Sequence, residues 1–413
     1  MTDRRVVITG LGVVSALGIG AGPVTAALRA GASGIRRLPE MADAGLKCQL
    51  FGAVHDWDDD LVQPKRTRTT MSRSTRFAVV AADQALAEAN LDPARCDRSR
   101  FGVVVGSAVS GIHDAVATML MTEGSGGVTR AGASGIVRYM SSSAAGNLSA
   151  RYGLQGRSLS MCSACAAGAD CIGHAFELIA RGDLDVCLGG ATEEELWRHV
   201  GITFDNWGAM PRKFNDAPAK AVRPYDRLRS GFVMGAGSGI LVLESAEHAQ
   251  ARGARILAEI VGYGSCNDGH DMFQPSGLGL VAAGSAALAQ ARARRGSGFR
   301  VAYLNGHGAA SAIGDPLECA AVRSVFADDR PLFSGTKPLS GHAMGGAGAL
   351  EAVFTLLMMR HGFAAATANL EDIADDCRDV EHVRAPIEIA LPAAATWNSG
   401  LGGSNACLIF AQP

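Results

Sequence analysis

Short runs of apolar residues alternate along the chain with longer Ala-rich stretches in which apolar residues recur at helical spacing. A short β-branched run bounded by turn residues favours a buried strand, whereas a long stretch with the 3.6-residue period favours a helix. This pattern predicts helices over residues 76–90, 166–180 and 349–359. It predicts strands over residues 5–9, 101–105, 185–188, 240–243, 256–261, 301–304 and 407–410.

The order of these elements is typical of an α/β protein with buried, largely parallel sheets. The segment EHAQARGARILAEIVGYG, close to residue 250, falls where a second α/β half would begin. We therefore expect one half over residues 1–250 and another over residues 251–413, without a disordered linker between them.

The N-terminal segment is basic and then apolar, which loosely resembles a signal peptide. Polar and small residues, among them Thr9, Gly10, Gly12 and Ser15, interrupt the apolar stretch, and no convincing cleavage site follows directly. We predict instead a buried strand that runs into a glycine-rich turn. Because no run of 18 apolar residues occurs, we expect no membrane span and a cytoplasmic location.

Composition narrows the classes of function. Hydrophobic residues make up 48% of the chain and charged residues 19%, so a large core can be buried. The formal net charge of −2 gives no global attraction to nucleic acid or anionic lipid. The ten cysteines are too sparse for a disulfide scaffold and suit a reducing compartment.

Cys165 is the first candidate for chemistry. It lies where a short β-like run gives way to an Ala- and Gly-rich predicted helix. A cysteine at a helix N-terminus is stabilised as the thiolate by the helix dipole, and neighbouring backbone N–H groups can bind a developing oxyanion. Cys165 is thus a plausible acyl-accepting nucleophile.

Three other interpretations of Cys165 stay open on this segment alone. Cys162 and Cys165 form a CxxC pair, which could be redox-active or half of a metal site, although no second pair with zinc spacing follows. Cys165 could also be a small buried core residue without chemistry.

Two later loops favour the catalytic interpretation. His307 lies in a glycine-flanked loop after a predicted strand, and Lys337 and His342 lie in a second such loop that leads into a helix. Loops at the strand ends of an open α/β sheet are common places for active sites.

A thiol and two imidazoles are sufficient for a decarboxylating condensation. The thiol holds one acyl group, and neutral imidazoles donate to the thioester carbonyl that gains charge as carbon dioxide leaves. We expect neither a metal nor an organic cofactor.

At this point the chain resembles a known family, the β-ketoacyl-ACP synthases of the thiolase superfamily, most closely the synthase I/II type. The likeness extends from end to end in these segments: VVITGLGVVSALG, SACAAGADCIG, GGATEE, RPYDRLRSGFVMGAGSGILVLE, EHAQARGARILAEIVGYG, NGHGAASAIGD, TKPLSGHAMGGAGALEA and NSGLGGSNACLIF.

The resemblance implies a duplicated α-β-α-β-α five-layer fold in a dimer. It also implies that Cys165 is acylated and that His307 and His342 bind the malonyl thioester carbonyl. Lys337 would organise the site. The remaining implied residues are Asp315 and Glu318 as charge partners of Lys337, Glu351 in a structural role, and the N–H groups of Cys165 and Leu401 as the oxyanion hole.

The chain departs from the family pattern around the acyl site. The usual HGTST loop is HGAAS, so that two hydroxyls are lost and Ser311 alone remains to bind phosphopantetheine. Leu401 replaces the phenylalanine that commonly gates the acyl pocket, Ser399 stands where an aromatic residue is common, and Val109 lies where pocket depth is often set. These departures favour a specialised polyketide or aryl-polyene type pathway over housekeeping fatty-acid synthesis.

The resemblance also bears on partners. Lys65, Arg66 and Arg68 fall where such synthases bind acyl carrier protein, although a solvated surface run would look the same. The partner subunit could be identical or a related ketosynthase-like chain.

Two other functions are possible for this fold. One is a non-elongating, chain-length-factor-like subunit, which typically lacks the nucleophile that Cys165 supplies here. The other is a thiolase-type enzyme, which would carry a second catalytic cysteine in a C-terminal loop, whereas Cys407 lies in a predicted strand.

Overall fold

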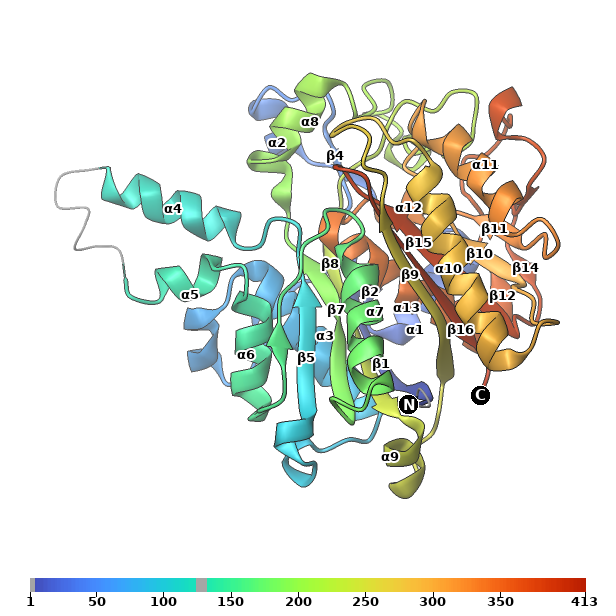
Figure 1. Ribbon diagram of the computed structural model, residues 1–413. Helices are drawn as coiled ribbons and strands as arrows, with labels where there is room; N and C mark the ends of the chain where they lie inside the picture. Colours follow the sequence, from blue (N-terminus) through green and yellow to red (C-terminus); the bar gives the residue numbers. More distant parts are fainter. Residues whose placement is uncertain (1–3, 124–131) are drawn as a thin grey trace.

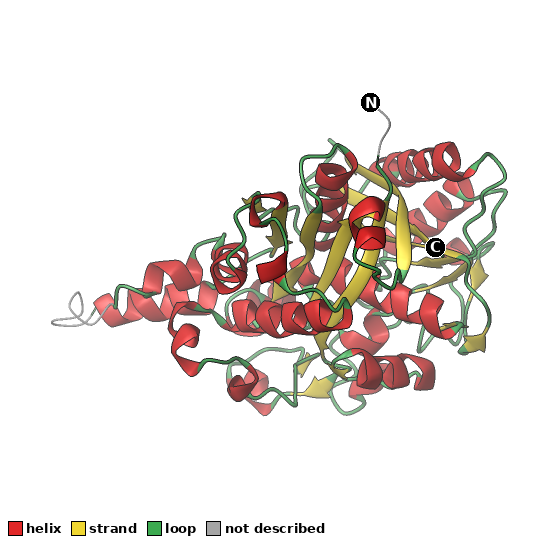
Figure 2. Ribbon diagram, turned by 90° about the horizontal axis from the view of Figure 1, so that it is seen from below, coloured by secondary structure: helices red, strands yellow, loops and turns green. Residues whose placement is uncertain are grey.

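The apolar runs become the strands of one mixed sheet. The computed structural model describes residues 4–123 and 132–413, and in that part of the chain twelve strands join edge to edge, with helices on both sides (Figures 1 and 2). Each predicted strand is confirmed with shifted ends, and most belong to longer elements; the strand predicted over residues 301–304 is instead three residues, 303–305. The strand order in the first half of the sheet is β6 (Ser158–Leu159), β5 (Phe101–Gly106), β7 (Val186–Glu193), β8 (Gly237–Ser245) and β1 (Val6–Ser15), with β2 (Gly18–Ile19) paired to β1.

The second half of the sheet repeats this order. When the two-residue strand at the outer edge of the second run (Glu381–His382) is left out, each run has five strands. Ranked by sequence, both then follow the spatial order third, second, fourth, fifth, first, with the same directions of pairing. Its strands are β13 (Glu381–His382), β11 (Leu332–Ser334), β10 (Tyr303–Asn305), β15 (Ala393–Ser399), β16 (Ser404–Ala411) and β9 (Ala258–Asn267). The two runs meet where β1 pairs antiparallel with β9, at three residues from Val6 to Ile8.

The expectation of largely parallel sheets is wrong at the centre of the molecule. β1, β8 and β7 pair antiparallel, as do β9, β16 and β15, and parallel pairing is confined to the outer strands. Continuous apolar sequence cannot distinguish the two arrangements, because antiparallel strands buried on both faces carry the same pattern.

Helices form the other layers. α7 (Ala167–Ala180) and α13 (Ala347–His361) pack against each other between the two halves of the sheet, together with α1 (Ala21–Ala30). One outer layer consists of α3 (Arg73–Glu88) and α6 (Ser143–Tyr152), and the other of α10 (Leu278–Arg295) and α11 (Gly314–Val325). This is the expected five-layer thiolase-like arrangement.

Strand alternation explains how the layers are held. On β16, Ala406, Leu408 and Phe410 face the central helices, while Cys407 and Ile409 face the outer ones. Because each strand presents apolar side chains to both sides, each half of the sheet is buried on both faces.

The glycine-rich turn expected after residue 9 is instead strand. β1 continues to Ser15, and its glycines face α3. A Cβ on Gly12 would lie 1.8 Å from the carbonyl oxygen of Ala81, and one on Gly10 would lie 2.0 Å from that of Ala85. Glycine therefore serves close strand–helix packing here rather than a turn.

The remaining elements lie at the edges of the layers. Two short strand pairs, β3 (Arg36–Arg37) with β4 (Leu50–Phe51) and β12 (Phe363–Ala364) with β14 (Ile387–Glu388), stand apart from the main sheet. The other helices are α2 (Pro39–Asp43), α4 (Ile112–Thr122), α5 (Gly135–Tyr139), α8 (Gly201–Trp207), α9 (Ala246–Ala251) and α12 (Lys337–Ser340). α4 and α5 pack on each other and project from the body as an arm (Figures 1 and 2). Among the described residues, no helix has both the length and the apolar character that crossing a bilayer requires.

Candidate active site

Loops from both halves of the sheet line one cavity of about 510 Å³. Cys165 comes from the loop between β6 and α7, His307 from the loop after β10, His342 from the loop after α12, and Leu401 from the turn between β15 and β16. The structure thus brings together four residues that are up to 236 positions apart in the sequence.

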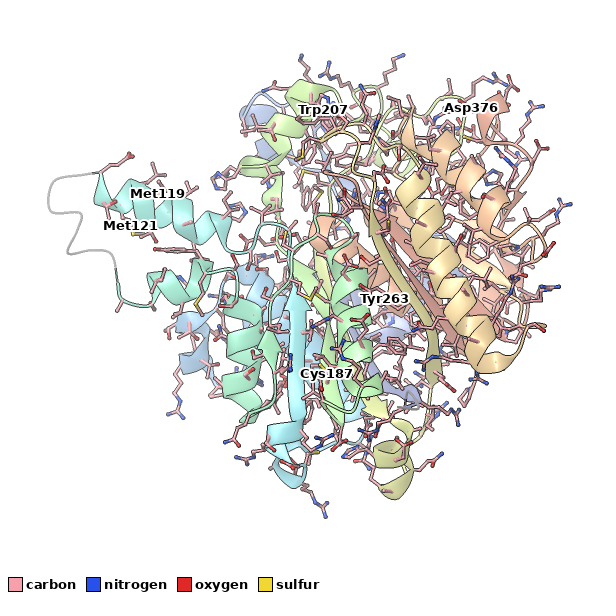
Figure 3. The ribbon with its side chains drawn as sticks, viewed as in Figure 1. Met119, Met121, Cys187, Trp207, Tyr263 and Asp376 are labelled. Atoms are coloured by element: carbon pink, nitrogen blue, oxygen red, sulfur yellow. The ribbon has the colours of Figure 1, made fainter. Side chains whose placement is uncertain are left out.

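The backbone around Cys165 is held in an unusual conformation. Ala164 has φ of 52°, in the left-handed region that costs an alanine energy, and α7 begins two residues after Cys165. The loop is fixed by a hydrogen bond from the hydroxyl of Ser163 to Asp170, which in turn accepts from the hydroxyl of Tyr263 at 2.8 Å. Tyr263 belongs to β9, so the second half of the sheet positions the loop of the first (Figure 3).

Burial dominates the ionisation of Cys165. It raises the pKa of the thiol to about 11, although the charge of Lys337 and a hydrogen bond from the Leu401 N–H lower the pKa in part. The expectation that the helix N-terminus favours the resting thiolate is therefore wrong, because removal of water outweighs these neighbours.

The glycine-rich turn at residues 400–403 lies directly against the nucleophile loop. A Cβ on Gly400 would lie 2.8 Å from the carbonyl oxygen of Ser163 and 3.1 Å from the nitrogen of Cys165. Only glycine permits this approach, which brings the N–H of Leu401 to the thiol. Within the described residues, neither the N–H of Cys165 nor that of Leu401 donates to a backbone carbonyl.

The two imidazoles of the site are in contact and neutral. The rings of His307 and His342 meet edge to face with centroids 5.3 Å apart. Burial and then the charge of Lys337 lower the pKa of each far below its ordinary value. Phe232 packs edge to face on His342 at 5.1 Å, and Nδ1 of His342 is buried with no hydrogen-bond partner among the described residues.

Lys337 is the charge at the centre of this network. Its side chain is 0% exposed, and its Nζ donates to Glu351 Oε1 at 2.5 Å and to the carbonyl oxygen of His307 at 2.5 Å, while His307 Nδ1 lies 3.3 Å away. Glu351 also accepts from Asn398 Nδ2 at 2.6 Å. The ion partner of Lys337 is therefore Glu351, which the sequence had assigned only a structural role.

The expected pairing of Lys337 with Asp315 and Glu318 is wrong. Glu318 accepts from the backbone N–H of His307 at 2.5 Å and of Gly308 at 2.9 Å, and Asp315 accepts from the N–H of Ser311 at 3.0 Å. Both carboxylates lie on α11 and hold the His307 loop by its backbone, because that tight loop leaves its amides without helix or sheet partners.

Glu193 belongs to the site region and was missed from the sequence. It lies at the end of β7, accepts from the Ser107 hydroxyl and the Ala108 N–H at 2.8 Å, and accepts from Gly345 N at 3.3 Å. Burial raises its pKa to about 7. The acidic pair in GGATEE could have pointed to Glu193. A carboxylate at the end of a predicted strand, however, is equally typical of a residue exposed to solvent.

The pocket residues chosen from the sequence divide into two groups. Ser311, Ser399 and Leu401 line the cavity, and the hydroxyl of Ser311 also accepts from Gly314 N at 2.9 Å, which caps the start of α11. Val109 lies outside the lining of this cavity as the described residues define it, and is half-buried against the outer core.

Large apolar side chains surround the cavity entrance. Trp207 and Phe273 meet edge to face at 5.3 Å, and Met272 and Ile313 lie in the same lining. All four side chains are more than half exposed, and Trp207 is labelled in Figure 3. Exposed apolar side chains at this density mark an interaction surface. This surface could not be predicted from the sequence pattern, because its residues come from three separate segments.

The basic run at residues 65–68 is only partly available at the surface. Lys65 and Arg66 are exposed, but Arg68 is 9% exposed, donates to the carbonyl of Val62 at 2.8 Å and pairs with Asp60 at 2.8 Å. The expectation that Arg68 binds a carrier protein is therefore wrong, because its guanidinium ties its own loop together.

The cysteines of the CxxC pair differ in environment. Both are free thiols, but Cys162 is exposed and directed at the carbonyl of Ala108, whereas Cys165 is buried in the cavity wall. In the described residues, no group of three or more potential ligands is arranged to hold a metal ion.

The chain is similar to known proteins along its whole length. Residues 3–249 match the family Beta-ketoacyl synthase, N-terminal domain, and residues 257–371 match Beta-ketoacyl synthase, C-terminal domain. A protein of Escherichia coli named 3-oxoacyl-[acyl-carrier-protein] synthase 1 is 38% identical over 98% of both chains. One of Rhizobium meliloti named 3-oxoacyl-[acyl-carrier-protein] synthase 2 is also 38% identical over 98% of both chains.

Solved structures give the same result. A β-ketoacyl synthase of Burkholderia phymatum has a TM-score of 0.92 and 36% identity, over 99% of this chain and all of that one. A type II polyketide ketosynthase in complex with its acyl-carrier protein, bound to a hexaketide, has a TM-score of 0.88 and 29% identity over both full chains. The ishigamide ketosynthase/chain length factor matches with the same three values.

The buried ion pair gives a stability prediction. Glu351→Ala leaves the ammonium of Lys337 buried without its counter-charge, and we expect a loss of about 3–5 kcal/mol in the free energy of unfolding by urea. The control, Glu388→Ala, removes the exposed partner of Arg29 and should cost at most about 1 kcal/mol. Equal losses in the two variants would contradict the central role of the Lys337–Glu351 pair.

Proposed function

The chain belongs to the β-ketoacyl synthase family and is a 3-oxoacyl-acyl-carrier-protein synthase, and from this premise we propose how its residues carry out the condensation. The observation that supports the proposal most strongly is the convergence of a thiol, two neutral imidazoles and the Leu401 N–H on one cavity.

In the first step Cys165 takes up an acyl group. Its sulfur attacks the thioester carbonyl of an acyl carrier protein, the carbon–sulfur bond to the carrier breaks, and the carrier thiol leaves with the proton of Cys165. The N–H groups of Cys165 and Leu401 bind the oxyanion of the tetrahedral intermediate, since neither is committed to a backbone carbonyl in the described residues.

In the second step malonyl carrier protein loses carbon dioxide. The electron pair of the broken carbon–carbon bond moves into an enolate, whose oxygen accepts hydrogen bonds from His307 and His342. Neutral imidazoles suit this task, because each can donate one N–H to the oxygen while the enolate forms. Neither ring adds a positive charge to the site. Lys337 and Glu318 hold the His307 loop in place.

In the third step the enolate carbon attacks the acyl carbonyl on Cys165. A carbon–carbon bond forms, the thioester to Cys165 breaks, and 3-oxoacyl carrier protein leaves while the Cys165 thiolate takes a proton from water. The three steps use only this chain's side chains, its two substrates and that proton, so we propose that the reaction needs no metal or organic cofactor beyond the carriers' phosphopantetheine.

We propose that the lining of the cavity selects a substrate of a specialised pathway, of polyketide or aryl-polyene type. All three departures line the cavity. Leu401 and Ser399 are smaller than the phenylalanine and the aromatic residue of the family pattern, and Ala309 lacks the hydroxyl of the family's threonine. The likeness to a ketosynthase that holds a hexaketide agrees with this direction. Ser311, whose hydroxyl accepts from Gly314 N and donates to no acceptor within the described residues, is the proposed contact to phosphopantetheine.

The carrier protein binds at the cavity entrance in this proposal. Lys65 and Arg66 supply exposed positive charge, and the apolar rim around Trp207 and Phe273 receives the carrier's apolar surface. A structural relative is bound to its acyl-carrier protein. We place the protein in the cytoplasm, where carrier-bound acyl groups are made.

We further infer that a second subunit of this fold covers the projecting arm. Met119, Leu120 and Met121 on α4 and Ile136 on α5 are more than half exposed, and Figure 3 labels Met119 and Met121. β6 is an edge strand, and in the part of the chain that the structure describes no strand pairs with its outer edge. A structural relative is a ketosynthase/chain length factor pair. The subunit can be identical or related.

Covalent loading tests the proposed chemistry. After incubation with acyl carrier proteins of varied length, intact-mass analysis should show one acyl adduct, which is absent from Cys165→Ala. Addition of malonyl carrier protein should remove the adduct and give 3-oxoacyl carrier protein. His342→Ala should load and then retain the acyl group, since decarboxylation fails while the nucleophile remains.

Failure to load distinguishes a stand-alone synthase from a non-elongating subunit. Absence of an adduct with every donor, in protein that is folded, would contradict a stand-alone synthase and favour the non-elongating subunit.

The oligomeric state tests the arm. Light scattering of the purified chain should give about twice 42.6 kDa, and Met119→Asp should shift the mass to that of the monomer. Ile387→Asp, an exposed apolar residue on β14 at the far side of the body from the arm, is the matched control and should leave the dimer intact (Figure 1). A monomeric parent that dimerises only with a related subunit would identify a heterodimer, and a dimer unaffected by Met119→Asp would contradict the role of the arm.

A further inference from the structure

A buried carboxylate on α7 joins the two halves of the sheet close to the nucleophile. Asp170 lies in the first turn of α7 and is 5% exposed. Its Oδ2 accepts from the hydroxyl of Ser163, and its Oδ1 accepts from the hydroxyl of Tyr263 on β9 at 2.8 Å. Asp170 therefore connects the nucleophile loop, residues 163–165, to a strand of the other half.

The contact between Tyr263 and α7 is part of the packing of the helix. A Cβ on Gly173, in the interior of α7, would lie 2.1 Å from Cε2 of the tyrosine ring. Glycine destabilises a helix interior relative to alanine, and here it leaves room for this ring. On α10, Gln290 Oε1 accepts from the backbone N–H of Tyr263 at 2.8 Å. Ring and backbone are thus both held where the hydroxyl meets Asp170.

The hydroxyl of Tyr263, a residue labelled in Figure 3, is kept as a donor. Burial and then the charge of Asp170 raise the pKa of Tyr263 well above its ordinary value, so the phenol keeps its proton at neutral pH. Neither residue is among the described residues that line the cavity. Any effect of the pair on a substrate must therefore pass through the nucleophile loop.

The nucleophile loop requires such an anchor. Ala164 has φ of 52°, and an alanine stays in the left-handed region only where its surroundings hold it there. On one side the loop is packed against Gly400, whose Cβ would lie 2.8 Å from the carbonyl oxygen of Ser163. On the other side the Ser163 hydroxyl is bound to Asp170. Release of that hydroxyl lets Ala164 relax and turns the N–H of Cys165 away from the oxyanion.

We propose that Tyr263 and Asp170 are positioning residues that hold the nucleophile loop in the conformation required for acylation, and that they have no part in decarboxylation. This inference rests on the proposed function, in which the N–H of Cys165 binds the oxyanion during acylation, whereas His307 and His342 bind the enolate. The two steps use donors on different loops. A change at Tyr263 or Asp170 therefore slows the first step and leaves the second unchanged.

Acylation and decarboxylation can be measured separately on the intact protein. With acyl carrier protein in excess, intact-mass analysis of quenched samples follows the acyl adduct on Cys165 with time. Malonyl carrier protein without an acyl donor reports decarboxylation. Carbon dioxide leaves, the enolate takes a proton from water, and acetyl carrier protein is the product that is counted.

Tyr263→Phe is the principal variant, because it removes one hydroxyl and keeps the ring against α7. At saturating acyl carrier protein the acylation rate should fall about tenfold, since a displaced nucleophile reacts slowly. The carrier concentration that gives half the maximal rate, and the decarboxylation rate, should stay at the parent values. Tyr152→Phe is the matched control. It removes a tyrosine–aspartate bond of 2.7 Å, from Tyr152 on α6 to Asp83 on α3, and should leave both rates unchanged.

Ser163→Ala tests whether the effect passes through Asp170. This variant should slow acylation at least as much as Tyr263→Phe does. The double variant should be no slower than Ser163→Ala alone, because no hydroxyl then remains on the loop for Asp170 to hold. Slowing by the product of the two single effects would show that the residues act independently, and the proposal would be wrong.

Two further results would overturn the positioning role. One is acylation at the parent rate in Tyr263→Phe, and the other is an equal loss of acylation and decarboxylation in that variant. If Ser163→Ala does not fold, as judged by urea unfolding, the comparison of Tyr263→Phe with Tyr152→Phe still decides. A parent protein that forms no adduct would instead contradict the proposed function, and the positioning role with it.

Discussion

The buried ammonium of Lys337 is the constraint around which the cavity is organised. It touches Glu351 on α13 and the carbonyl and ring of His307, so a single charge links the central helix layer to the strand-end loop. A charge without access to water must be compensated, and Glu351 does so. The same charge acts with burial to keep both imidazoles neutral and partly offsets the effect of burial on the thiol.

The repeated strand order explains why these groups meet. Each half of the sheet ends its parallel strands at the same side, so the loop before α7 from one half faces the loops after β10 and β15 from the other. Contacts between the two halves fix the distance between these loops. Tyr263 on β9 donates to Asp170 on α7, and Gly400 lies against the backbone of Cys165. Neither half contains a complete site, which gives a physical reason for retaining both.

The sequence predicted elements better than it predicted contacts. Periodicity identified the main helices and strands, and glycine-flanked histidines and the Cys165 segment, together with the family resemblance, identified residues that the structure places in one cavity. The predictions that were wrong concern contacts between residues that are distant in the sequence or buried by their own loop. Glycines 10 and 12 are in a strand because α3 packs on them, Arg68 is buried by its own loop, and Lys337 pairs with Glu351 rather than Asp315 or Glu318. The division near residue 250 stays a prediction.

Histidine protonation is the most direct test of this account. With 15N-labelled histidine, imidazole nitrogen shifts of His307 and His342 can be followed from pH 8 downwards and assigned by replacing each residue with glutamine in turn. Both imidazoles should stay neutral as the pH falls well below the ordinary histidine pKa of about 6.5, because burial and the charge of Lys337 lower the pKa of each. Protonation of either ring near pH 6.5 would contradict the claim that burial and the Lys337 charge prepare a neutral pair of donors for the condensation.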